Sequence, residues 1–228
     1  MKKSLFVLLA VLVLFAFPAF AQGGKESTSP KIGFIGPMTG DNANYGVLSN
    51  NSAILAVEQF NAKGGIDGKI PVVLVTEDSE GVPEKGLAAI EKLSSSDKIV
   101  GLVGPIFTGV SFAVGERVQN EGIVMISPSA THADITNIGD YVFRTVVSDG
   151  LQGEVAGTYF AQVLGYKNIG VLYAKNDYSQ GLYESMSASF TANGGKITIV
   201  ESFNVGDKDL RTQLTKIRSA NPQAIYIP

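Results

Sequence analysis

Cysteine is absent from the 228 residues, and histidine occurs once, at His132. Without cysteine the chain can form no disulfide, so its stability must come from the burial of apolar side chains. One imidazole, no thiol and no Gly-x-Ser-x-Gly motif leave hydrolytic triads and common transition-metal sites without their parts. We therefore expect no enzyme activity, no metal site and no cofactor, and we interpret His132 as a solvated loop residue. An exported α/β hydrolase is the enzyme alternative, but no nucleophile and base can be identified for it.

Clusters of lysine and arginine are also missing, and the formal net charge is −3. A nucleic-acid partner normally requires a basic patch, so we expect no such partner. Glycine-rich turns occur at Gly33-x-x-Gly36 and Gly101-x-x-Gly104, but neither completes a dinucleotide fingerprint or a phosphate loop. The sequence therefore carries no nucleotide-binding motif.

The first residues have the pattern of a secretory signal peptide. Lys2 and Lys3 precede an uncharged apolar run, residues 5–17, and small residues follow at Ala19 and Ala21. The run is shorter than the about 20 apolar residues that a membrane-spanning helix needs. We expect cleavage after Ala21 and a periplasmic location, with an uncleaved membrane anchor as the alternative. Residues 22–30 are small and polar and are expected to form a flexible tether.

Short runs rich in valine and isoleucine alternate with longer amphipathic stretches from residue 31 onward. This alternation is typical of βαβ units in a mostly parallel sheet, and the length suits two lobes. We predict an N-terminal α/β lobe over residues 31–147 and a second α/β lobe over residues 148–228. The predicted strands are residues 31–35, 70–75, 99–103, 123–126, 169–173, 196–201 and 224–227. The predicted helices are residues 46–62, 83–93, 109–120, 151–164, 180–192 and 210–220.

The last residues, 224–227, form an apolar run that ends in a predicted strand. Natural domains generally avoid ending on an unpaired strand, because its edge and its apolar side chains stay uncovered. We therefore expect the second lobe to be incomplete, with its C-terminal part missing.

Polar turns follow three of the predicted strands in the first lobe. They are Gly36-Pro37-Met38-Thr39-Gly40, Gly104-Pro105-Ile106-Phe107-Thr108-Gly109 and Ser127-Pro128-Ser129-Ala130-Thr131. Open α/β sheets bind ligands at the carboxyl ends of their strands, so we expect these turns to meet at one edge. A helix that begins near Thr108 would offer free backbone N–H groups to a small carboxylate, and Thr131 could add a hydroxyl. Alternatively, both threonines only cap helices.

Four segments resemble the branched-chain amino acid binding proteins, the Leu/Ile/Val type of the type I periplasmic binding fold. They are residues 32–46 with Gly36-Pro37-Met38-Thr39-Gly40 and Tyr45-Gly46, residues 54–67 with Phe60-Asn61-Ala62-Lys63-Gly64-Gly65-Ile66, residues 122–131, and Asp177-Tyr178-Ser179-Gln180-Gly181. The resemblance covers nearly all of the predicted mature chain. It implies two α/β lobes that close on a small molecule.

The resemblance also implies roles for individual residues. Thr108 and Thr131 would hold the α-carboxylate of an amino acid, while the Ser129 carbonyl and the Thr131 hydroxyl would receive its ammonium. Tyr45 and Tyr178 match aromatic positions that line the cleft from the first and second lobes, and the acidic partner of the ammonium would lie beyond residue 228. Phe107 is bulky where relatives can carry a small residue, which leaves the ligand open. The predicted ligand-binding residues are Tyr45, Phe107, Thr108, Ser129, Ala130, Thr131 and Tyr178.

Taken with the family's known function, the resemblance implies a monomeric, extracytoplasmic solute-binding protein. It would capture an aliphatic amino acid and deliver it to the permease of an ABC importer. Two alternatives stay open: a ligand-binding sensory module, and a binder of a small amide, urea or an aromatic compound.

Overall fold

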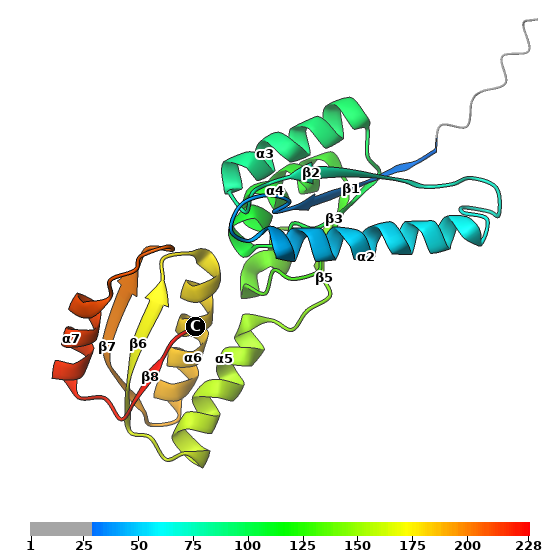
Figure 1. Ribbon diagram of the computed structural model, residues 1–228. Coiled ribbons are helices and arrows are strands. Elements are labelled where there is room, and N and C mark those ends of the chain that lie inside the picture. The colour runs from blue at the N-terminus through cyan, green and yellow to red at the C-terminus, as the bar shows by residue number, and fades with distance from the viewer. Residues whose placement is uncertain (1–28) are drawn as a thin grey trace, which may run out of the picture.

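The computed structural model describes residues 29–228, and it contains two α/β units that each surround their own parallel sheet (Figure 1). The predicted signal peptide and residues 22–28 of the predicted tether lie outside the described residues. Among the described residues, no helix combines the length and the apolar character needed to cross a bilayer.

The first sheet has five parallel strands in the order β2-β1-β3-β4-β5. The strands are β1 (Lys31–Gly36), β2 (Val73–Asp78), β3 (Gly101–Val103), β4 (Val124–Ser127) and β5 (Val142–Arg144). All strands run the same way, so the polar turns that follow β1, β3 and β4 meet at one edge, as the sequence predicts.

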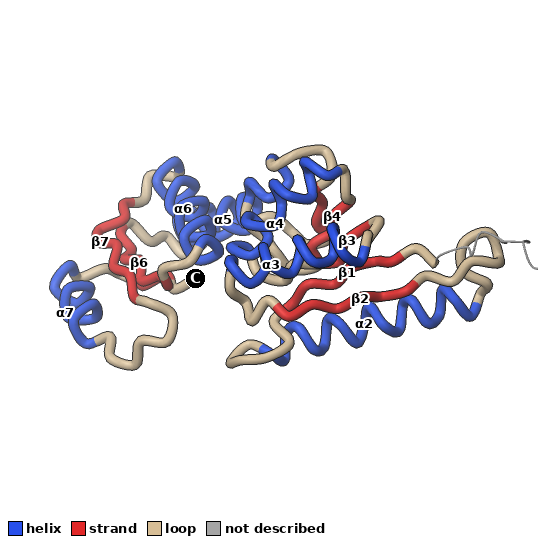
Figure 2. Tube along the Cα trace, turned by 90° about the horizontal axis from the view of Figure 1, so that it is seen from above, coloured by secondary structure: helices blue, strands red, loops and turns tan. Residues whose placement is uncertain are grey.

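Helices cover both faces of this sheet. The helix α2 (Ala43–Ala62) lies on one face, and α3 (Pro83–Lys92) and α4 (Thr108–Glu121) pack together on the other (Figures 1 and 2). A π-turn, η1 (Leu93–Asp97), extends α3, and a 3₁₀ turn, η2 (Ala133–Asn137), precedes β5. The core between the sheet and the α3–α4 layer includes the fully buried residues Ile35, Ile90, Leu93, Val114, Met125 and Ile135.

The face of α2 that carries Val47, Ile54 and Phe60 is largely exposed, although these residues form an apolar side of the helix. The residues that α2 buries are Gly46 and Asn50. Asn50 accepts a hydrogen bond of 2.7 Å from the Thr76 hydroxyl, so a polar contact joins α2 to β2. The helix is found where the sequence predicts it, and a polar contact attaches it to the sheet.

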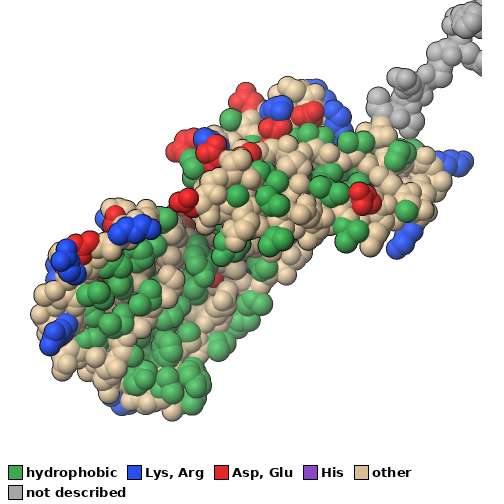
Figure 3. Space-filling model, viewed as in Figure 1, with side chains coloured by type: hydrophobic (Ala, Val, Ile, Leu, Met, Phe, Trp, Pro, Cys, Tyr) green, Lys and Arg blue, Asp and Glu red, His purple; other side chains and the backbone are tan. Residues whose placement is uncertain are grey.

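The second sheet has three parallel strands in the order β7-β6-β8. The strands are β6 (Asn168–Ala174), β7 (Lys196–Phe203) and β8 (Ala224–Tyr226). The helices are α5 (Asp149–Thr158) with the π-turn η3 (Tyr159–Val163), α6 (Asp177–Ala192) and α7 (Arg211–Ala220). Apolar side chains gather on the exposed side of this unit (Figure 3). Among the exposed apolar residues, α5 carries Leu151 and Val155, and Val147 lies in the connection before it.

The element order confirms the predicted alternation, and most predicted elements differ from the observed ones by only a few residues at their ends. The edge strand β5 is not among the predicted strands. The clearest error is the second strand, predicted at residues 70–75 and observed at Val73–Asp78. Ile70 instead pairs with Ile66 in a turn, and Pro71 has no N–H group for a ladder. The Asn61 side chain bonds both the N–H and the carbonyl of Val72 at 2.8 Å, which ties this approach segment to α2.

Residues 145–148 connect β5 of the first unit to α5 of the second. The backbone N–H of Asp149 donates to the carbonyl of Thr131 at 2.8 Å, so the two units are also joined beside this connection. Helices α4 and α6 make a further contact between the units.

Candidate functional site

The loop after β1 is fixed by the side chain of Asp78, which ends the neighbouring strand β2. Asp78 accepts hydrogen bonds from the Met38 N–H at 2.7 Å, the Thr39 hydroxyl at 2.5 Å and the Glu80 N–H at 2.7 Å. Partial burial raises the pKa of Asp78, but these hydrogen bonds favour the carboxylate and together lower the pKa below its usual value. An ionised Asp78 therefore holds the loop that leads to Tyr45.

Tyr45 and Phe107 come together at this edge of the sheet. Their rings lie 5.9 Å apart in an edge-to-face arrangement, and Tyr45 stays 55% exposed. The position of Tyr45 depends on Gly46, because a Cβ there would lie 2.5 Å from the carbonyl carbon of Pro37. Glycine thus lets the first turn of α2 lie directly on the loop after β1.

Thr108 is the first residue of α4 and is 3% exposed. Phe107 occupies the N-cap position, and no side chain caps the helix. The alternative that Thr108 is simply a capping residue is therefore wrong. The free backbone N–H groups of a helix start favour an anion, and Thr108 is the first residue of this helix.

The turn after β4 is organised by the buried hydroxyl of Ser127. It donates to the Pro105 carbonyl at 2.6 Å and accepts from the Ala130 N–H at 3.0 Å. The turn after β3 and the turn after β4 are therefore linked through one side chain. Of the predicted residues in this turn, Ser129 is exposed and Ala130 is buried.

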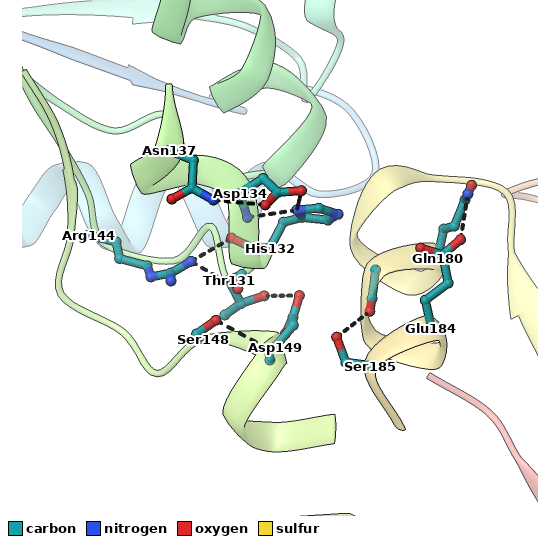
Figure 4. Close-up of polar contacts among 12 residues, drawn as sticks. Thr131, His132, Asp134, Asn137, Arg144, Ser148, Asp149, Gln180, Glu184 and Ser185 are labelled. Atoms are coloured by element: carbon teal, nitrogen blue, oxygen red, sulfur yellow. Dashed lines mark hydrogen bonds and ion pairs between the residues drawn. The ribbon is translucent and has the colours of Figure 1, made fainter. Parts of the chain in front are cut away.

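Thr131 is bonded to Asp149, the first residue of α5 in the second unit (Figure 4). The Thr131 hydroxyl donates to Oδ2 of Asp149 at 3.0 Å, and the Thr131 carbonyl accepts from the Asp149 N–H. Thr131 does not cap η2, because His132 is the N-cap there and accepts from the Asp134 N–H at 3.2 Å. The predicted ligand residue therefore lies where the two units join.

Asp149 is fully buried, with 0% of its surface exposed. Desolvation raises the pKa of Asp149, while the Thr131 hydroxyl and the charges of His132 and Arg144 act in the opposite direction. Arg144 on β5 donates through Nη1 to the carbonyls of Thr131 and His132 (Figure 4). Asp149 and Arg144 therefore both bond to Thr131 at the junction, and Arg144 also bonds to His132.

Tyr178 lies in the first turn of α6 and is 42% exposed. The Asn176 side chain caps this helix by accepting from the Ser179 N–H at 2.8 Å. Burial raises the pKa of Tyr178, and the negative charge of Asp149 raises it further. Burial likewise raises the pKa of Tyr226 to about 12, with added contributions from Tyr178 and Asp149.

The structure thus groups the predicted residues in two places. Tyr45, Phe107 and Thr108 lie at the ends of β1 and β3, while Thr131 is hydrogen-bonded to Asp149, whose negative charge also raises the pKa of Tyr178. Two open hollows of the described surface lie elsewhere, on α5 and at the start of α7, and no predicted residue lines them. Residues 29–228 hold no group of three or more metal-ligating side chains.

Sequence reasoning missed three residues at this junction. Asp149 and Arg144 carry no local signal of burial, since an acidic residue after Ser148 has the pattern of an ordinary helix start. The interpretation of His132 as a solvated loop residue is wrong, because its side chain is 19% exposed and its ring packs edge-to-face on Phe112 at 5.0 Å.

Comparison with known proteins gives relatives that bind small molecules. The chain is 31% identical over 227 residues to the leucine-, isoleucine-, valine-, threonine- and alanine-binding protein of Pseudomonas aeruginosa, covering 99% of this chain and 60% of that protein. Among solved structures, the branched-chain amino acid transporter substrate-binding protein LivJ of Streptococcus pneumoniae, in complex with isoleucine, matches with a TM-score of 0.76 and 33% identity. A solute-binding protein of an ABC transporter from R. palustris, in complex with benzoate, matches with a TM-score of 0.77 and 26% identity.

The match covers most of this chain but only part of each relative. It covers 88% of this chain and 57% of LivJ, and 88% of this chain and 55% of the benzoate-bound protein. The chain therefore spans between half and two thirds of the length of these relatives. The family model described as periplasmic binding protein matches residues 29–227, and with that match the chain belongs to the periplasmic binding protein family.

Proposed function

We propose that this protein is an extracytoplasmic solute-binding protein that captures an aliphatic amino acid between its two α/β units and delivers it to an ABC importer. Membership of the periplasmic binding protein family supports the capture of a solute. The name of the Pseudomonas relative and the isoleucine in the LivJ complex support an aliphatic amino acid as the ligand.

The observation that carries the proposal is the placement of Thr108 and Thr131 at one edge of the first sheet, beside the second unit. Thr108 begins α4, whose free N–H groups and positive end of the helix dipole favour a carboxylate. Thr131 adds a hydroxyl at the junction with α5, and its single proton, donated to Asp149 in this structure, would turn to the ligand carboxylate. Hydrogen bonds to a charged ligand group are stronger than neutral ones, so two hydroxyls and a helix start suit an α-carboxylate.

Tyr45 and Tyr178 give the ligand a neighbour on each unit. Tyr45 begins α2 in the first unit, and Tyr178 begins α6 in the second. Both rings keep roughly half of their surface exposed, so each can bury further area against a ligand. A ligand that contacts both favours an arrangement in which the units are close.

The proposal also covers the boundary between the lobes and the cellular setting of the protein. The boundary between the lobes is placed at residues 147 and 148, inside the connection from β5 to α5. The chain is exported, its leader is cleaved after Ala21, and it acts as a monomer without catalytic activity. Its protein partner is the permease of an ABC importer, and nucleic acid is not a partner.

A second candidate ligand is an aromatic carboxylate, which the benzoate complex of the R. palustris protein favours. Thr108 and the start of α4 would serve a benzoate carboxylate equally well, and Phe107 with Tyr45 offers aromatic surface beside it. The two candidates differ in the ammonium group, which benzoate lacks.

Isothermal titration calorimetry of the protein from its complete reading frame tests the proposal. The panel holds the aliphatic L-amino acids, small amides, urea and benzoate at matched concentrations. We expect heat of binding from one or more aliphatic L-amino acids and none from benzoate. Binding of benzoate alone would favour the second candidate, and binding of amides alone would exclude both.

A further inference from the structure

His132 lies between the two units and faces α6. Its Nδ1 accepts from the Asp134 N–H, its ring packs on Phe112 of α4, and its carbonyl accepts from Arg144. These contacts hold the backbone and the ring from the first unit. In Figure 4 the imidazole points away from Arg144 and toward α6, which carries Gln180 and Glu184.

Gly181, in the interior of α6, is the residue that receives the His132 ring. A Cβ built on Gly181 would lie 2.6 Å from Nε2 of His132 and closer still to its Cδ2. Real Cβ atoms essentially never approach another heavy atom below 3.0 Å, so the ring occupies the space that any other residue would fill. Gly181 is buried in this arrangement.

Glycine is unfavourable inside a helix, where it costs about 0.5–1 kcal/mol relative to alanine, so its presence in α6 needs a reason. Backbone conformation is not that reason, because Gly181 is not among the glycines with positive φ. Space for the His132 ring is the remaining explanation. A second contact between the units has the same form: a Cβ on Gly109 of α4 would lie 2.9 Å from Oδ2 of Asp177 on α6.

We propose that the His132 ring seated on Gly181 is the contact that sets how closely the two units approach, which makes both residues positioning residues for ligand capture. This inference rests on the proposed function, because closeness of the units matters for a ligand held between them. A side chain at position 181 would prevent the arrangement in the structure without touching the predicted ligand residues.

Gly181→Ala tests the contact with the smallest possible addition. Alanine favours the helix, so urea unfolding should show no loss of stability. Affinity for the best amino acid of the calorimetric panel should fall by about tenfold or more, which corresponds to about 1.4 kcal/mol. Gly150→Ala is the matched control, because it adds the same methyl group to α5 near the junction, where the nearest atom is 3.4 Å away.

His132→Ser should restore the ligand affinity that Gly181→Ala removes. Serine can still cap η2 but removes the ring, so Gly181→Ala should have little effect in the His132→Ser background. A double-mutant cycle should therefore be strongly non-additive, with Gly181→Ala costing less than about threefold in affinity once the ring is gone. If Gly181→Ala lowers stability in the wild-type background, the double variant still reports whether the ring is the cause.

A second readout needs no ligand and separates this inference from the proposed function. Because the 228 residues contain no cysteine, paired spin labels can be placed at exposed Asn51→Cys on α2 and Thr212→Cys on α7. Gly181→Ala should shift the distance distribution of the unliganded protein toward larger separations, and His132→Ser should reverse the shift. An unchanged distribution in Gly181→Ala would overturn the inference, whether or not the wild-type protein binds an amino acid.

Discussion

Thr131 donates its single hydroxyl proton to Asp149. The resemblance to amino-acid-binding proteins implies contacts of this hydroxyl with both charged groups of the ligand, so the proton must turn from Asp149 to the ligand carboxylate on binding. Thr108 is assigned one contact. We therefore predict that Thr131→Ala lowers affinity more than Thr108→Ala does. Hydrogen bonds to charged groups are worth about 1.5–3 kcal/mol each, so the loss at Thr131 should exceed tenfold.

Thr131→Ser is the control for this comparison, because it retains the hydroxyl and should bind within about threefold of the wild type. Calorimetry of the three variants with the same amino acid gives the ranking. Equal losses at Thr131 and Thr108, or a larger loss at Thr108, would show that the residue roles are misassigned.

The buried carboxyl of Asp149 should make the stability of the protein depend on pH. Burial raises the pKa of its carboxyl, although Thr131, His132 and Arg144 oppose this shift. If the pKa of Asp149 is higher in the folded state than in the unfolded state, the folded protein binds this proton more tightly. The stabilisation that the proton provides is lost as pH rises through the raised pKa, so the free energy of unfolding falls. Asp149→Asn does not titrate, so the stability of the variant relative to the wild type should increase from about pH 3 to about pH 7.

Urea unfolding at several pH values measures this difference. Asp140→Asn, at an exposed carboxylate outside the junction, is the matched control and should show a smaller pH-dependent difference. A difference between Asp149→Asn and wild type that stays constant with pH would contradict the prediction.

Local sequence patterns identify some residues of the candidate site but not their partners. The turns that carry Thr108 and Thr131 are recognisable because parallel strands must place their carboxyl ends together. Asp149 lies at a helix start, where acidic residues are common on the surface, so its burial follows only from packing against the first unit. His132 is similar: only the fold brings its ring to Gly181.

At the scale of elements, the start of α6 depends on its N-cap. Asn176 accepts from the Ser179 N–H, and this cap holds the turn that carries Tyr178. Asn176→Ala should lower the free energy of unfolding by about 1 kcal/mol and weaken ligand binding at the same time. Asn176→Asp keeps a side-chain oxygen at the cap and should behave nearly like the wild type. Thermal unfolding together with calorimetry checks both effects.

The elements of the fold are mostly predictable because their signals are local. Periodicity, Pro83 at a helix start and apolar strand runs identify the observed order of helices and strands, apart from the short edge strand β5. Where prediction fails, a longer-range contact decides. Asn61 ties Val72 to α2 and delays β2, and a polar contact to Thr76 replaces apolar burial on α2.

At the scale of the whole molecule, the two units meet through a short connection, the Thr131–Asp149 pair, the His132 ring on Gly181 and the contact of α4 with α6. A ligand that contacts Tyr45 and Tyr178 should stabilise the arrangement in which these units are closest. Small-angle scattering of the protein from its complete reading frame should show a smaller radius of gyration at saturating amino acid. An unchanged radius would count against closure by relative movement of the units.

The central claim is that the protein recognises both charged groups of an amino acid. Calorimetric titration with L-leucine, its amide and 4-methylpentanoate tests this claim most directly, because the amide lacks the carboxylate and 4-methylpentanoate lacks the ammonium. We expect L-leucine to bind and each analogue to bind at least about a hundredfold more weakly, since each leaves charge-assisted hydrogen bonds unmade. Binding of either analogue as tightly as L-leucine would contradict the claim.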